Sequence, residues 1–243
     1  MARQKDMKVT GTYDGIIYYR LYENLYCMRT VPAVVRQTEA TKASAADLGT
    51  KSRSASLIKN GFASLINDNK DARMWSRLVS AEGKAMQADT KNPKGKLCVQ
   101  NGDPGYLLNF QFNARAETSR ILKVKPYVDL SEDGQVIFKP PELIPQKDNR
   151  APKGTDVTVI TVQSSFFGFA AFNCRASAIQ EIVIPYTNEF FPSGSLRFTS
   201  ETTSGGMAML AFSINFYRKH GSFLTMLTDK RFGGATVAGI KKF

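Results

Sequence analysis

The side chains best suited to catalysis are few and widely separated in this sequence. His220 is the single histidine, and the three cysteines are Cys27, Cys98 and Cys174, which lie 71 and 76 residues apart. A cysteine paired with a histidine would provide a nucleophilic thiolate, but His220 lies in a probable turn and no local motif brings a cysteine to it. The wide, odd-numbered spacing fits neither a disulfide framework nor a zinc site. We therefore predict no catalytic residue, no metal and no cofactor.

Sequence motifs of other chemistries are missing as well. No G-x-S-x-G elbow, P-loop or D-x-D-x-D-G calcium loop occurs, and the glycines of 204–206 are typical of a hairpin turn. Acidic pairs such as Glu132-Asp133, and Asp68 with Asp71, occupy an expected turn and an expected helix start. These observations predict a protein that is not an enzyme.

The charge of the chain is the stronger functional signal. Lysine and arginine total 33 against 21 acids, a net charge of +12, and residues 1–100 alone hold 17 basic and 9 acidic residues. Such an excess favours a polyanion such as nucleic acid as partner, or else simply solvates a helix surface. The candidate polyanion-facing residues are Arg36, Lys42, Lys51, Arg53, Lys59, Arg73 and Arg77.

Targeting signals are not evident. The N-terminus has no apolar segment typical of a signal peptide, and no apolar run approaches the roughly 18 residues of a membrane span. We expect a cytoplasmic protein at synthesis, with a virion or another assembled particle as the alternative final location.

The elements that would position these residues begin with a predicted β-hairpin. Alternation puts Ile16 and Tyr18 on one face and Tyr19 on the other, with a turn at Glu23-Asn24. An isolated hairpin is marginally stable in water, so this one should pack on its own chain or on a neighbour. The predicted assembly interface consists of Ile16, Tyr18, Tyr19, Tyr22, Tyr26, Ile58 and Phe62.

Residues 38–91 have the pattern of a helical hairpin. One apolar stripe follows helical spacing, and Gly49 and Gly61 are the positions where this helix could break. The stripe is formed by Leu48, Ala55, Ile58, Phe62 and Leu65. A second helix is expected from about Asp71 to Asp89, with Trp75, Val79 and Met86 marking one face.

After about residue 100 the sequence consists of short strands separated by turn signals. A first hairpin is expected from Ile121–Tyr127 and 136–138, and longer strands follow, for example at 156–169 and 207–218. The predicted fold class is α+β: an N-terminal β-hairpin and an αα-hairpin followed by a mainly antiparallel β-sandwich. The expected domains are 1–36, 37–96 and 97–243.

The order of motifs resembles a group of uncharacterised bacterial proteins of similar length. The landmarks are G-T-x-x-G-I-x-Y-Y-R (Gly11 to Arg20), Arg29, Pro32, T-x-A-x-x-A-S-A-A-D-L-G (Thr38 to Gly49) and K-D-A-R-M-W-S-R-L (Lys70 to Leu78). The hairpin–arginine–proline–helix opening, about residues 8–65, is also similar to the start of small prophage-encoded proteins presumed to be structural. The resemblance implies a non-enzymatic assembly component and supplies no catalytic residues.

Two functional hypotheses follow from the sequence. The first is a structural protein that self-assembles into a virion-like or prophage-derived particle or filament through its N-terminal hairpin–helix arm. The alternative is a cytoplasmic nucleic-acid-binding protein that uses the basic helical region. A carbohydrate-binding sandwich has little support, because the only tryptophan, Trp75, lies in a predicted helix.

Overall fold

The computed structural model describes residues 3–5, 8–22, 25–34 and 36–243. The chain divides into two compact units, residues 1–42, called here the N-terminal unit, and residues 43–243, called here the body. The expected domain boundaries at residues 36 and 96 stay predictions.

The N-terminal unit is a four-stranded antiparallel sheet in the order β1-β2-β3-β4. Its strands are β1 (Arg3–Lys5), β2 (Lys8–Tyr13), β3 (Ile16–Tyr22) and β4 (Leu25–Thr30). The predicted hairpin is thus present as β3 and β4, while its expected turn at Glu23-Asn24 lies outside the described residues. Wherever burial is described in this unit, side chains are exposed or half-buried and none is fully buried.

Helices form the first part of the body. Helix α1 (Glu39–Gly61) runs through Gly49 and ends at Gly61, and the short α2 (Ala63–Ile66) follows. Helix α3 (Met74–Gln87) is the second long helix of the predicted helical hairpin. Shorter turns of helix are η1 (Pro104–Leu107), α4 (Thr118–Ile121) and α5 (Pro145–Asp148).

Two antiparallel sheets complete the body. The larger sheet is centred on β7 (Val157–Gly168) and β11 (Met207–His220), which pair over 11 positions. Around them lie β8 (Asn173–Ala176), β9 (Gln180–Pro185), β12 (Phe223–Met226) and β13 (Gly234–Lys242). The smaller sheet has the order β10-β6-β5, with β5 (Tyr127–Leu130), β6 (Gln135–Lys139) and β10 (Leu196–Thr199).

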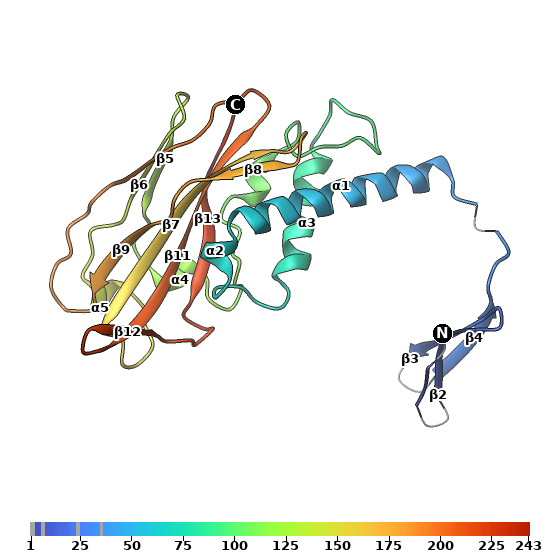
Figure 1. The fold of residues 1–243 in the computed structure, drawn as a ribbon, viewed down its shortest axis with the longest axis horizontal. Helices are drawn as coiled ribbons and strands as arrows, with labels where there is room; N and C mark the ends of the chain where they lie inside the picture. The colour runs from blue at the N-terminus through green and yellow to red at the C-terminus, as the bar shows by residue number, and fades with distance from the viewer. Residues whose placement is uncertain (1–2, 6–7, 23–24, 35) are drawn as a thin grey trace. The chain divides into compact units, whose positions relative to one another are not determined.

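The two faces of the larger sheet belong to different cores. Alternate residues of β11 point to opposite faces, so Met207 and Met209 share one core cluster with helices α1 to α3. Phe212 and Ile214 join a second cluster with the smaller sheet, for example with Phe138 of β6. Figure 1 shows α1 and α3 on one side of β7, β11 and β13, and β5 and β6 on the other.

Close packing explains one glycine that ends the first helix. A Cβ atom added to Gly61 would lie 2.6 Å from Phe167 Cε1 and 2.7 Å from Cys174 Sγ, whereas one added to Gly49 would meet no atom within 4 Å. The buried Ser165 hydroxyl donates to the Gly61 carbonyl at 3.3 Å. The end of α1 therefore needs glycine because its backbone packs directly on β7 and β8.

The predicted mixed α and β composition, the N-terminal hairpin and the antiparallel sheets are confirmed, whereas a sandwich is not. Some details differ from the sequence prediction. The segment expected to start the first body hairpin forms helix α4 up to Ile121, and the strand begins only at Tyr127. Leu48 and Trp75, both expected on apolar helix faces, are exposed. The buried face of α3 runs instead through Met74, Leu78, Glu82, Ala85 and Met86.

Membrane insertion through a helix finds no support in the described part of the chain. None of its helices combines the length and the apolar character that a bilayer crossing requires.

Candidate functional site

The residues with catalytic potential remain apart in the folded body. His220 is exposed at the end of β11, paired with Phe223 of β12. Cys98 follows α3 and Cys174 lies in β8, and neither forms a disulfide. Among the described residues, no three histidine, cysteine or carboxylate side chains gather in a way that could hold a metal ion.

The predicted assembly residues fall into two groups. Ile16, Tyr18 and Tyr26 are half-buried and Tyr19 and Tyr22 exposed, all on β3 and β4 of the N-terminal unit. The other two, Ile58 and Phe62, lie in the core of the body.

Ile58 and Phe62 are fully buried there, and the Phe62 ring meets Phe112 and Phe167 edge-on. These two side chains stabilise the body and belong to no surface that a partner could reach.

Strand register places an apolar face on the N-terminal sheet. Tyr13 pairs with Ile16, Tyr18 with Met28, and Arg20 with Tyr26, so their side chains share one face. This face is defined here as the apolar face, formed by Tyr13, Ile16, Tyr18, Tyr26 and Met28. Among the side chains described in this unit, the charged one on the same face is Arg20, which donates its Nε–H to the Tyr22 carbonyl at 3.1 Å. Tyr13 and Met28, which the sequence prediction missed, are its most exposed members.

Most of the predicted polyanion-facing residues already contact groups within their own unit. Lys42 pairs with Glu39 at 2.8 Å. Arg53 lies 4.7 Å from the centre of the Phe172 ring, and Lys59 lies 5.9 Å from that of Trp75. Lys51 lies beside Gly83 of α3, and Arg36 is exposed. Lys51, Arg53 and Lys59 thus each lie against a different residue of the body.

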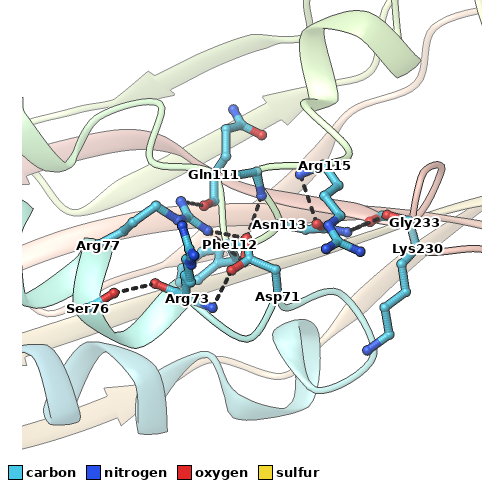
Figure 2. Close-up of polar contacts among 11 residues, drawn as sticks. Asp71, Arg73, Ser76, Arg77, Gln111, Phe112, Asn113, Arg115, Lys230 and Gly233 are labelled. Carbon is cyan, nitrogen blue, oxygen red and sulfur yellow. Dashed lines mark hydrogen bonds and ion pairs between the residues drawn. The ribbon is translucent and has the colours of Figure 1, made fainter. Parts of the chain in front are cut away.

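Arg77 has a structural partner, as Figure 2 shows. Its Nη2 lies 2.5 Å from Asp71 Oδ2, and its Nη1 donates to the Gln111 carbonyl at 2.7 Å. Asp71 also accepts the backbone N–H groups of Arg73 at 2.7 Å and Ala114 at 2.8 Å. Burial alone would raise the pKa of Asp71, but these backbone N–H groups and the Arg77 guanidinium hold it below its usual value.

Arg73 is the second predicted cation, with Arg77, that the structure brings into one group. It lines a cavity of about 620 Å³ together with Arg77, Arg115 and Lys230, and with Asp71 and Asn113 between them. We call this cavity the basic pocket. Arg115 and Lys230 were not predicted as members of a basic group. They lie more than 40 and 150 residues from Arg73 along the chain, and no local pattern links them to it.

The basic pocket is held by buried polar contacts between loops. Asn113 is almost fully buried, and its amide donates to the carbonyls of Lys230 and Gly233, each at 2.8 Å. Its oxygen accepts the backbone N–H of Arg115 at 3.1 Å. Asn113 thereby fixes the backbone of two segments that carry cationic side chains (Figure 2).

Several acids that interrupt the basic sequence have structural roles. Asp47 on α1 accepts the N–H groups of Gly95 and Leu97, at 2.9 and 3.2 Å. Asp89 accepts N–H groups of the loop after α3, including that of Cys98. Glu82 is fully buried with no hydrogen-bond partner for either oxygen among the described residues, and burial raises its pKa to about 8. The positive surface is therefore less interrupted than the sequence indicates.

Comparison of the chain with protein-family models, with curated proteins and with solved structures found no match.

Proposed function

We propose that this protein is a non-enzymatic structural protein that self-assembles through its N-terminal unit. The observation that supports this most directly is the apolar face on a sheet that has no buried side chain where burial is described. A small sheet gains independent stability only when a hydrophobic face is covered. A large exposed apolar surface is typical of an interaction site.

A second copy of the chain is the partner that we propose. The chain carries a net charge of +12, so two copies repel each other through most of their surfaces. The apolar face reduces this repulsion, because its five members are uncharged and Arg20 beside it directs its Nε–H to the Tyr22 carbonyl. Two such faces would bury tyrosine and methionine side chains and bring few like charges together.

Strand β4 offers a second contact for the same assembly. It is at the edge of the four-stranded sheet, pairing with β3 on one side. An edge strand can add a strand from another chain through main-chain hydrogen bonds. Antiparallel pairing of two β4 edges would be symmetric, and pairing with a different segment would allow a filament or particle. The resemblance to prophage-encoded structural proteins favours a filament or particle. We also propose that the two sheets of the body are arranged as a sandwich.

Light scattering coupled to size-exclusion chromatography tests this proposal. The wild-type chain should elute as an oligomer at micromolar concentration, and the double substitution Tyr13→Ser/Met28→Ser should shift it to the monomer. The matched control is Phe190→Ser/Phe223→Ser, which removes two similarly exposed apolar side chains from the body. A monomeric wild type, or an equal effect of both variants, would contradict the proposal. Negative-stain microscopy of the wild type then distinguishes particles or filaments from small oligomers.

Polyanion binding is the second candidate function. It is favoured by one observation, the gathering of Arg73, Arg115 and Lys230 in the basic pocket.

A further inference from the structure

We propose that the basic pocket binds a phosphate group, with Arg73, Arg115 and Lys230 as the side chains that contact it. The pocket belongs to the body and is independent of the apolar face proposed for assembly. The same phosphate chemistry is offered by free inorganic phosphate and by the backbone of a nucleic acid, and the experiment below separates these two sources.

The balance of charge in the pocket is positive. The side chains of Arg73, Arg115 and Lys230 form no ion pair or hydrogen bond with any described residue, although all three line the same cavity. Arg77, the fourth cation, is already paired with Asp71. Three cationic side chains thus face one cavity without a partner, which leaves their hydrogen-bonding capacity available for an anion.

The carboxylate that lines the pocket does not cancel this charge. Asp71 Oδ1 accepts the Arg73 N–H, and Oδ2 accepts both Arg77 Nη2 and the Ala114 N–H. Its carboxylate is therefore satisfied by hydrogen bonds within the protein, and its negative charge is balanced by Arg77. The other acid of the adjoining loop, Asp229, is held by Arg231 at 2.6 Å. Neither acid is free to neutralise Lys230 or Arg115.

The backbone that carries these cations is already fixed in position. Asn113 joins the segment of Arg115 to that of Lys230, and Asp71 joins the start of α3 at Arg73 to Ala114. An anion that binds here has to order the three side chains but not the loops, because hydrogen bonds hold the loops before it arrives. Such preorganisation lowers the entropic cost of binding.

The number of cations present favours phosphate over a carboxylate. Two guanidinium groups offer planar, paired N–H donors that match the oxygens of either anion, and a lysine adds a compact charge. Three positive charges suit a phosphate better, because a phosphate group carries more negative charge than a carboxylate. A cavity of about 620 Å³ also leaves room for the groups attached to a phosphate ester.

Binding of two probes to the full-length protein tests the proposal. Inorganic phosphate is titrated by calorimetry, and a fluorescent single-stranded DNA oligonucleotide by anisotropy over a range of salt concentrations. The test variant is Arg115→Gln/Lys230→Gln, which keeps both side chains polar and removes two charges that have no partner among the described residues. The matched control, Lys153→Gln/Arg197→Gln, removes two exposed charges from elsewhere on the body. Thermal unfolding of each variant verifies that it folds.

The expected result is that the wild type binds and that the test variant binds about tenfold more weakly or worse, as the loss of two charge-assisted contacts implies. The control should bind like the wild type. If the oligonucleotide binds and phosphate competes with it, the source is a nucleic-acid backbone. The slope of log affinity against log salt should then be smaller in magnitude by about 1.4 in the test variant, about 0.7 for each of the two charges removed. If phosphate alone binds, the ligand is a small phosphate compound.

Two results would overturn the proposal: no binding of either probe by the wild type, or equal binding by the test variant and the control. Neither result bears on assembly through the apolar face, which is measured separately.

Discussion

The N-terminal unit and the body are both built from antiparallel strands, yet only the body has fully buried side chains where burial is described. In the body, the alternating residues of β7 and β11 meet helices on one face and the smaller sheet on the other. In the N-terminal sheet, strand alternation also places Tyr13 and Met28 on one face, but both side chains remain exposed. Strand alternation therefore creates apolar faces, and a second layer is needed to turn them into a core.

Removing a large side chain from the body's core should have the largest effect. The substitution Phe62→Ala deletes a fully buried ring that contacts Phe112 and Phe167, and should lower the free energy of unfolding by about 4 kcal/mol. Urea unfolding followed by the fluorescence of Trp75, the only tryptophan, reports on the body. The exposed Phe223→Ala serves as the control, with an expected change within about 0.5 kcal/mol. Equal effects of the two substitutions would refute the description of a dense core in the body.

The buried Glu82 should make the stability of the body depend on pH. Its pKa is raised from 4.5 to about 8, so the folded state keeps the proton that the unfolded state releases. The stability that Glu82 contributes is therefore greatest below about pH 4.5 and falls as the pH rises toward 8. Between about pH 5 and pH 8 the loss should be on the order of 3 kcal/mol from this group.

Comparison of the wild type with Glu82→Gln isolates this contribution. The variant should gain stability over the wild type at about pH 8 and differ little from it at about pH 5, as measured by urea unfolding at each pH. A stability difference that stays constant with pH would show that Glu82 is ionised in the folded body.

The two glycines of α1 test where the helix is in close contact with the sheet. Gly61→Ala would place a methyl group against the buried Phe167 ring and Cys174, and should cost about 2 kcal/mol. Gly49→Ala enters open space within the same helix and should gain about 1 kcal/mol from helix propensity. Thermal unfolding of both variants should give shifts of opposite sign, and shifts of the same sign would contradict the packing of α1 on β7.

Changes on the apolar face should have the smallest effect on the body. Tyr13→Ser/Met28→Ser should leave the free energy of unfolding reported by Trp75 within about 0.5 kcal/mol, because no core residue of the body is altered. The measurement is made at a protein concentration low enough to dissociate the assembly. A loss of 2 kcal/mol or more would show that the body depends on this face for its own stability, and the contrast between the two units would fail.

Much of the fold follows from patterns within short segments. The spacing of Leu48, Ala55, Ile58, Phe62 and Leu65 predicts a buried helix face, and the structure buries all of them except Leu48. Alternation in 156–169 and 207–218 predicts the long central strands β7 and β11. These features depend on neighbours within a few residues, so a sequence displays them directly.

The candidate sites were harder to predict because they depend on distant residues. Arg115 and Lys230 lie near Arg73 because hydrogen bonds of Asn113 and Asp71 hold their loops together. Tyr13 joins the apolar face through the register of β2 on β3, which places it opposite Ile16. No single segment contains the information on either grouping.

Composition and short periodicities in the sequence define the class of the long helices and strands, the basic charge of the chain and the scarcity of catalytic side chains. Which charged side chains are paired or buried within the fold depends on the tertiary structure. Arg77 and Asp71 neutralise each other, and Glu82, an acid in a basic helix, is fully buried. The tertiary structure also decided that Phe62 stabilises a core while Tyr13 stays exposed. The physical reason is that burial and ion pairing depend on which surfaces the chain brings together in space, and the residues that meet there lie far apart along it.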